Sequence, residues 1–370
     1  MFRKKLFASI LTMSLVTGAF LGCSFIDGLP YHSAGKTPKE EAMLSNDWEY
    51  RDRLFLPGYF RNHLKSKLAE IKQVYSAENK NQEIFVFFTD YHIEENQGYS
   101  PLIIKELQKE LPLSMIVFGG DIYDAGPEQA QAMAKMEHFQ KRFAFAGDKW
   151  QQVIGNHEYN TCFGNRKARP QAFIDNARLQ NKLLAKQLEA SGGHNFYGDY
   201  WLDKGDMRYF FVGATSGEKV REAQCKWLFT EFAKVPDGKN IMLFSHIGCV
   251  PSLPKGRIDN SFMPITQALS MVKHGKNFVW HDETYAYNSK KVQVVGCMTG
   301  HVHWDDMATA NGIKVTATIS DTLRYNPTKE QLRKPGTISE QIMDVVVIDK
   351  AQRKVNLFRI GYGKNRSFKY

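Results

Sequence analysis

Short apolar runs alternate with helix-spaced segments from Glu83 onward. Apolar runs of about four to eight residues predict strands, whereas apolar residues recurring every three or four positions predict amphipathic helices. Five predicted strands each lead into a polar segment: residues 84–88, 115–118, 152–154, 241–244 and 292–297. Helical spacing is found over residues 102–111, 128–143, 171–188 and 221–232. This alternation is typical of an α/β fold.

The second half of the chain adds strand-like runs with short connections, at residues 209–212, 314–318, 343–348 and 355–360. Short connections favour antiparallel pairing. We therefore expect two mixed β-sheets packed as a sandwich and flanked by helices, rather than one parallel sheet. Residues 25–81 are polar and irregular apart from the helical stripe Leu64, Leu68 and Ile71. We interpret them as a tether that leads into one helix.

The first residues are typical of an export signal. Arg3, Lys4 and Lys5 precede an apolar stretch over residues 6–21, which is short for a membrane span. The Leu-Gly-Cys that ends at Cys23 resembles a bacterial lipoprotein processing site, although Phe20 stands where that pattern usually has Leu. We expect an exported protein held at the cell envelope by acyl chains on Cys23. A secreted protein and an uncleaved anchor are the alternatives.

Charge and cysteine content narrow the choice of partners. The formal net charge is +10, and removing the three basic residues of the signal, which has no acidic residue, leaves +7. This surplus suits an anionic substrate or anionic membrane headgroups. Nucleic acid ranks lower because no Lys/Arg stripe is interleaved with aromatic residues. The four cysteines after Cys23 form no CxxC pair, and they are either disulfide-bonded or buried thiols.

The polar segments after the five strands carry the candidate chemistry. Loops that follow strands are where α/β folds build their sites. Residues two apart at a strand end point the same way, so Asp90 and His92 could reach one cation, as could His301 and His303. The segments are Asp90-Tyr91-His92, Gly120-Asp121-Ile122-Tyr123-Asp124, Gly155-Asn156-His157-Glu158, Ser245-His246 and Gly300-His301-Val302-His303.

Three of these residues have competing interpretations. Asp121 could bridge two cations through its two carboxylate oxygens, or it could cap a helix. The Asn156 amide oxygen could bind a cation, although Asn-His also occurs in ordinary turns. His246 follows an apolar strand and is either a ligand or a packed core histidine. The ligand interpretation gains weight because the other segments are present.

His157 follows Asn156 directly and would project differently, so it would stay free of the cations. Such an imidazole can protonate a leaving oxygen or donate a hydrogen bond to a phosphoryl oxygen. It needs a partner that holds its tautomer, and Asp124 or Glu158 could supply that carboxylate.

Together the five segments resemble the signature of the calcineurin-like metallophosphoesterase superfamily, in the order DxH, GDxxD, GNHE, a single strand-end His and GHxH, over residues 84–303. The resemblance implies an αββα sandwich of four layers with two metal ions. It implies that the first ion is bound by Asp90, His92 and His303, that Asp121 bridges, and that the second ion is bound by Asn156, His246 and His301. His157 would act as acid or transition-state stabiliser. These ligands suit Mn, Fe and Zn alike.

The resemblance leaves the subfamily open. Asp124 is followed by Ala125-Gly126 instead of the arginine of the Ser/Thr protein phosphatases, and it occupies the position where purple acid phosphatases have a tyrosine ligand.

We expect a signal over residues 1–22, a tether and helix over 23–82, and a catalytic domain over 83–370. Two ions roughly 3.5–4 Å apart can activate water for phosphate ester hydrolysis, of monoesters or diesters. We slightly favour small-molecule or lipid-headgroup esters, with a nuclease or a non-catalytic surface module as alternatives.

Overall fold

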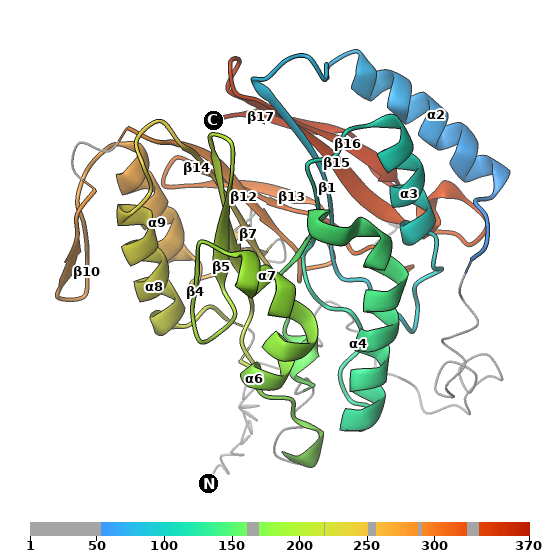
Figure 1. Ribbon diagram of the computed structural model, residues 1–370, viewed down its shortest axis with the longest axis horizontal. Helices are drawn as coiled ribbons and strands as arrows, with labels where there is room; N and C mark the ends of the chain where they lie inside the picture. Colours follow the sequence, from blue (N-terminus) through green and yellow to red (C-terminus); the bar gives the residue numbers. More distant parts are fainter. Residues whose placement is uncertain (1–52, 161–169, 218, 251–256, 288–290, 324–332) are drawn as a thin grey trace, which may run out of the picture.

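The computed structural model describes residues 53–160, 170–217, 219–250, 257–287, 291–323 and 333–370. Two large mixed sheets form the centre of the molecule (Figure 1). The predicted signal, Cys23 and most of the predicted tether lie outside the described residues, so these expectations remain predictions.

The first sheet joins the early strands to the end of the chain. Strands β1, β2 and β3 are parallel, so their carboxyl ends meet at one edge, whereas β15, β16 and β17 pair antiparallel beside β1. The strand order is β17 (Arg366–Lys369), β16 (Lys354–Gly361), β15 (Ile342–Asp349), β1 (Gln82–Phe88), β2 (Met115–Phe118) and β3 (Trp150–Gln152).

The second sheet has a parallel centre with antiparallel edges. Strands β6, β7, β12 and β14 are parallel, so β7 and β12 also deliver their carboxyl ends to one edge. The order is β13 (Asp306–Ala310), β14 (Ile313–Ala317), β12 (Gln293–Thr299), β7 (Asn240–Ser245), β6 (Met207–Val212), β5 (Tyr200–Lys204) and β4 (Gly193–His194). Two short hairpins pair β8 (Cys249–Val250) with β9 (Arg257–Ile258) and β10 (Phe278–Trp280) with β11 (Glu283–Tyr285).

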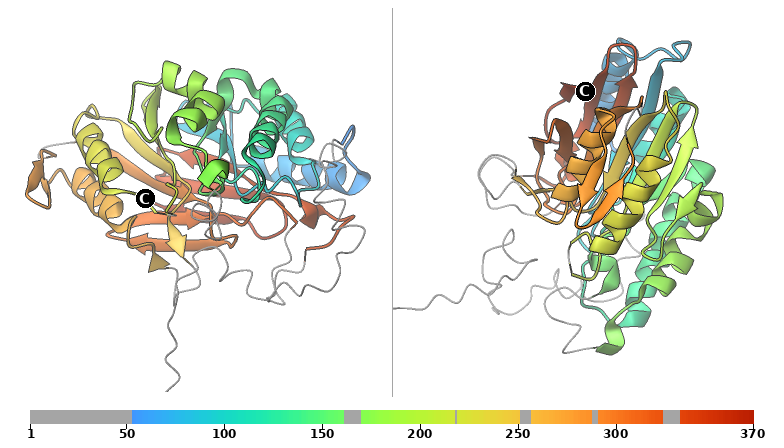
Figure 2. Two further views of the ribbon diagram at one scale, coloured as in Figure 1. Left: turned by 90° about the horizontal axis from the view of Figure 1, so that it is seen from below. Right: turned by 90° about the vertical axis from the view of Figure 1, so that its left-hand side faces the viewer.

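Helices lie outside both sheets. Figure 1 shows α2 (Gly58–Lys72), α3 (Ser100–Glu110) and α4 (Gln129–Phe143) beside the first sheet, with α8 (Glu222–Ala233) and α9 (Met263–Lys273) beside the second. The view from below in Figure 2 keeps the two groups apart. A helical segment formed by α6 (Asn176–Leu179), a π-turn (Gln180–Leu184) and α7 (Ala185–Ala190) contacts both α4 and β5. The expected α/β fold with two mixed sheets is confirmed.

Some boundaries differ from the sequence-based expectation. Strand β3 begins and ends two residues earlier than predicted, and the helix expected from residue 171 begins at Asn176 after a short turn. Helix α9 was missed, although Ile265, Ala268, Leu269 and Val272 have helical spacing and are buried. Cys225, Cys249 and Cys297 are buried free thiols, and Cys162 lies outside the described residues.

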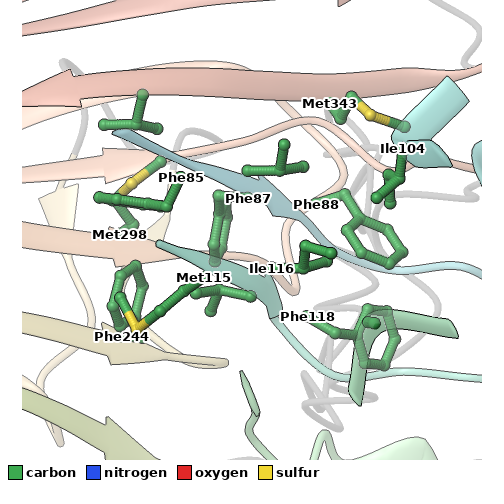
Figure 3. Close-up of a cluster of buried hydrophobic side chains, with 14 of the residues drawn as sticks. Phe85, Phe87, Phe88, Ile104, Met115, Ile116, Phe118, Phe244, Met298 and Met343 are labelled. Carbon is green, nitrogen blue, oxygen red and sulfur yellow. The ribbon is translucent and has the colours of Figure 1, made fainter. Parts of the chain in front are cut away.

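Alternating side chains on the strands fill two separate cores. On β7, Met242 and Phe244 point between the sheets, whereas Ile241 and Leu243 belong to the core under α8 and α9. Between the sheets, the Phe244 ring lies 5.5 Å from the ring centroid of Phe85 and 5.8 Å from that of Phe87. Figure 3 shows these rings together with Met298 of β12. This contact fixes the spacing of the two sheets.

Replacing Phe244 with Ala tests whether this contact also positions the strand ends. We expect a loss of about 3–5 kcal/mol in the free energy of unfolding and a roughly tenfold weaker Mn²⁺ affinity at the predicted site, because supporting residues position the ligands. Denaturant titration and metal titration measure the two effects. The control is Phe210→Ala, since Phe210 is buried against Phe232 in the other core. It should lose similar stability and keep its metal affinity, and equal metal loss in both variants would contradict the idea.

Candidate metal centre

All seven predicted ligands meet at one edge shared by the two sheets. Those of the first sheet follow β1, β2 and β3, and those of the second follow β7 and β12. The side chains are buried or nearly so, with relative exposures of 0% for three of them and 1% for two more. The full set is Asp90, His92, Asp121, Asn156, His246, His301 and His303.

The first half of the centre combines Asp90, His92, Asp121 and His303, each of which offers a donor atom within 4.8 Å of the others. His303 Nε2 lies 3.0 Å from His92 Nε2 and 3.1 Å from Asp90 Oδ1. Three atoms that can each accept a hydrogen bond therefore converge on one point. Such an arrangement requires a shared proton or a cation.

The second half combines His246, His301, Asn156 and again Asp121. The Asn156 amide oxygen lies 2.8 Å from His246 Nε2 and 3.0 Å from His301 Nδ1, and His246 Nε2 lies 3.1 Å from Asp121 Oδ2. His246 Nδ1 is 2.8 Å from the Gly119 carbonyl oxygen, which can only accept. Nδ1 therefore donates, and Nε2 of a neutral His246 presents its lone pair to the site.

Asp121 belongs to both groups of donor atoms, which is the position that a bridging carboxylate needs. The alternative, a helix cap, is wrong: within the described residues the next helix is α4, and its N-cap is Glu128. Gly120, just before Asp121, has φ +97°, and a Cβ there would come within 2.7 Å of the Gly155 nitrogen. The glycine thus allows the loops after β2 and β3 to touch.

The backbone at the centre is held in an uncommon conformation. Asp90, His92, Asp121, His301 and His303 have φ values of 53°, 39°, 64°, 71° and 53°. Non-glycine residues in this left-handed region cost of the order of 1–3 kcal/mol each, although Asp and His tolerate it better than most. Contacts from the surrounding structure must offset that cost. The hydrogen bonds of Glu158 are among these contacts.

Glu158 ties the β2 and β3 loops together. Its Oε2 accepts hydrogen bonds from the Asp121 and Gly155 amides, at 3.2 and 2.5 Å, and its Oε1 accepts one from Ile122 at 2.5 Å. Burial and the nearby Asp121 charge raise the pKa of Glu158 to about 7, against the effect of these amides. Glu158 was a candidate partner for His157, but in the structure its carboxylate binds backbone amides instead.

His157 lies beside the ligands with its tautomer fixed. The Ala125 amide donates to His157 Nδ1 at 2.9 Å, so a neutral ring carries its proton on Nε2, which lies 3.7 Å from Asp121 Oδ2. The Nε2–H group therefore faces the centre as a donor. Asp124 Oδ1 lies 2.7 Å from His92 Nδ1, and a His157 nitrogen is within 4.8 Å of that pair. The catalytic role of Asp124 stays a prediction.

Neighbouring charges set the protonation of the ligands. Burial alone would raise the pKa of Asp90, but His303 lowers it to about 2. Burial and the His246 charge lower the pKa of His301 to about 3. Burial opposes the charge on His246, yet Asp121 raises its pKa to about 9. Of these three groups only His246 holds a proton at neutral pH that a cation would displace. The donor set fits Mn, Fe or Zn without selecting one.

A buried charge network supports the loop that carries His301 and His303. Asp305, two residues after His303, forms two 2.7 Å hydrogen bonds with the Arg359 guanidinium, whose Nε donates to Asp344 at 2.9 Å. Arg366 also pairs with Asp344, at 2.6 Å. This network was not among the predictions, although a charged residue stands within each of the apolar runs 343–348 and 355–360.

Replacing Arg359 with Met should leave two carboxylates without their main partner. Arg359 and Asp344 are 1% and 0% exposed, so we expect a loss of about 3–5 kcal/mol in unfolding free energy and a metal affinity lowered roughly tenfold. Lys226→Met is the control, because Lys226 pairs with Glu283 on the surface and should cost about 1 kcal/mol or less. An unchanged metal affinity in Arg359→Met would show that the network does not position the loop.

Removing metal should make stability depend on His246. Its pKa is raised from 6.5 to about 9 in the folded protein, so its contribution is complete below pH 6.5 and is lost as pH rises through about 9. Chelator-treated protein should lose about 3 kcal/mol of unfolding free energy between pH 6.5 and 9.5, and His246→Gln should lose less. Denaturant midpoints across this range, with and without Mn²⁺, give the measurement. If the stability of the wild type and of His246→Gln changed equally with pH, the pH dependence could not be assigned to His246.

Comparisons with known proteins agree with this fold. The family model described as calcineurin-like phosphoesterase matches residues 84–305. The chain is similar to the crystal structure of a dimetal phosphatase from Danio rerio, with 10% identity, a TM-score of 0.52, and coverage of 78% of this chain and 99% of that one.

A purple acid phosphatase from yellow lupin (Lupinus luteus) seeds is 11% identical, with a TM-score of 0.43 and coverage of 77% of this chain and 53% of that one. At such identities the likeness concerns the fold alone. No functionally curated protein matches the sequence. The family match spans more than half of the chain and includes every strand end that carries a predicted ligand. This chain belongs to the calcineurin-like phosphoesterase family.

Proposed function

We propose that this metal-dependent phosphoester hydrolase binds two cations, bridged by Asp121, and hydrolyses phosphate esters of small molecules outside the cytoplasm. One observation carries the proposal: Asp121 is shared by two groups of converging donor atoms, and the Nε2 of His157 lies 3.7 Å from its carboxylate. A structural cation site would need neither the shared carboxylate nor the additional imidazole beside it.

Metal binding and proton donation would fall to different residues. Asp90, His92 and His303 would hold one cation, and Asn156, His246 and His301 the other. Two cations in this position would activate water and neutralise charge on the phosphoryl oxygens. His157 would donate its Nε2 proton toward a phosphoryl or leaving oxygen, because the Ala125 amide keeps Nδ1 as an acceptor. The backbone ties made by Glu158 keep this geometry rigid before substrate arrives.

Export and membrane attachment are proposed from the sequence. The apolar stretch before Cys23 and the basic surplus of the chain support a location at the cell envelope, where phosphorylated small molecules or lipid headgroups would be substrates. In the part of the chain that the structure describes, no helix has the length and apolar character to cross a membrane. A non-catalytic surface module would be expected to lack ligands or His157, and here all are in place.

Two substitutions test the separation of roles. His157→Ala should lower kcat by roughly 10²- to 10⁴-fold, as expected for loss of an acid or oxyanion donor, while metal content stays near that of the wild type. Asp121→Ala should lose metal and activity together. Activity on p-nitrophenyl phosphate and elemental analysis of the same samples give both values.

The control for this test is His194→Ala, since His194 is exposed on β4 and should change neither value. Equal metal loss in His157→Ala and Asp121→Ala would refute the assigned roles. Parallel assays with bis-p-nitrophenyl phosphate and single-stranded DNA separate a monoesterase from a diesterase and a nuclease. A protein that holds metal but cleaves none of the three would refute the proposed function.

A further inference from the structure

A cavity of about 320 Å³ is lined by Tyr159, which lies two residues after His157 in the chain. Its walls come from three connections: the segment after β3, the β4–β5 loop, and the segment between β6 and α8. Cavities that bind small molecules typically have volumes from about 300 Å³ upward. The volume therefore suits one ring-bearing group and is too small for a protein segment or a nucleic acid strand.

The cavity shares structure with the centre. Tyr159, which lines it, belongs to the same short helical turn as His157. On the other side, the Ala214 amide donates to the Ile154 carbonyl at 2.7 Å, which places Thr215 next to the loop that carries Asn156. A phosphate ester held at the cations would thus have its alcohol portion close to this cavity.

Four aromatic side chains line part of the cavity. Tyr159 and Phe173 lie nearly parallel, with ring centroids 6.4 Å apart and an angle of 20°. Phe196 and Tyr197 meet edge to face at 5.4 Å. Phe196 is 71% exposed, which is unusual for a phenylalanine, and it stands where a bound ring would cover it. The Phe196 ring is therefore available for stacking on a planar group, which a flexible aliphatic group cannot match.

Polar groups at the cavity could orient such a ring. Tyr159 donates its hydroxyl hydrogen to Asn176 Oδ1 at 2.6 Å, which fixes the Asn176 amide with its NH₂ group as a donor. Arg221 also lines the cavity, and its residue is exposed. A planar cation can stack on an aromatic ring or donate to ring heteroatoms.

From these contacts we propose that the cavity binds the planar aromatic portion of the substrate, so that the preferred phosphate esters are those of ring-bearing alcohols, such as aryl alcohols or nucleosides. The proposal rests on the proposed function for its reaction and adds the substrate class. It argues against an aliphatic lipid headgroup, which the location alone had slightly favoured.

Phe196→Ala tests the proposal, because an exposed side chain can be removed without loss of the fold. We expect kcat/KM for adenosine 5′-monophosphate and p-nitrophenyl phosphate to fall roughly 5- to 50-fold, mainly through KM, as stacking is lost. The value for glycerol 3-phosphate should stay unchanged. Comparing variant with wild type for each substrate cancels differences in leaving-group reactivity. Phe196→Tyr should restore the activity, and Phe55→Ala, which removes another Phe that is 73% exposed, should change nothing.

Calorimetric titration with adenosine separates this inference from the proposed function. Adenosine lacks a phosphate, so its binding to the wild type and its loss in Phe196→Ala would support the cavity even if no ester were cleaved. If the protein hydrolyses esters but adenosine does not bind, and Phe196→Ala affects all three esters equally, the inference is overturned and the proposed function stands. A larger effect of Phe196→Ala on adenosine 5′-monophosphate than on p-nitrophenyl phosphate would identify a nucleoside as the preferred alcohol. A larger effect on p-nitrophenyl phosphate would identify an aryl alcohol.

Discussion

The aromatic contact between Phe87 of β1 and Phe244 of β7 is the constraint on which the rest of the structure depends. Phe87 lies three residues before Asp90, and Phe244 two residues before His246. Close packing of rigid rings leaves the two sheets a single separation directly beneath the ligands. Loops from different sheets can therefore meet within hydrogen-bond distance, as at His246 and Asp121. If this core were packed less tightly, each sheet could still form, but the two sets of strand ends would no longer meet at one metal centre.

That packing also balances a site that is unfavourable by itself. Five ligand positions have left-handed backbone, and buried carboxylates lie beside several imidazoles. Backbone ties from Glu158 and the ion pairs of Arg359 hold the loops in place, so their strain is opposed by contacts outside the ligand set. A proton on His246 partly balances the acidic groups, and a cation would do so more completely. These contacts hold the ligands in the positions that cations would need.

The strand-end residues were predictable from sequence because each signal is local: an apolar run, then a polar residue of the right type. Their order along the chain supplied the remaining information. The Arg359 network could not be found in this way, because Asp305, Asp344 and Arg359 are brought together only by the pairing of β15 with β16 and by the packing of the two sheets. Likewise Glu158 looked like a side-chain partner for His157, since nothing local shows that three backbone amides converge on it.

Chemistry and substrate choice have different physical origins in this fold. The ligands sit at the ends of paired strands, where any displacement would break several contacts, whereas the cavity beside them is lined by connecting segments. Connecting segments generally tolerate substitution better than the strands that they join. Replacing Phe173 or Phe196 would alter which alcohol fits without moving a ligand. The same centre can therefore serve different esters, and the aromatic lining marks the choice made by this chain.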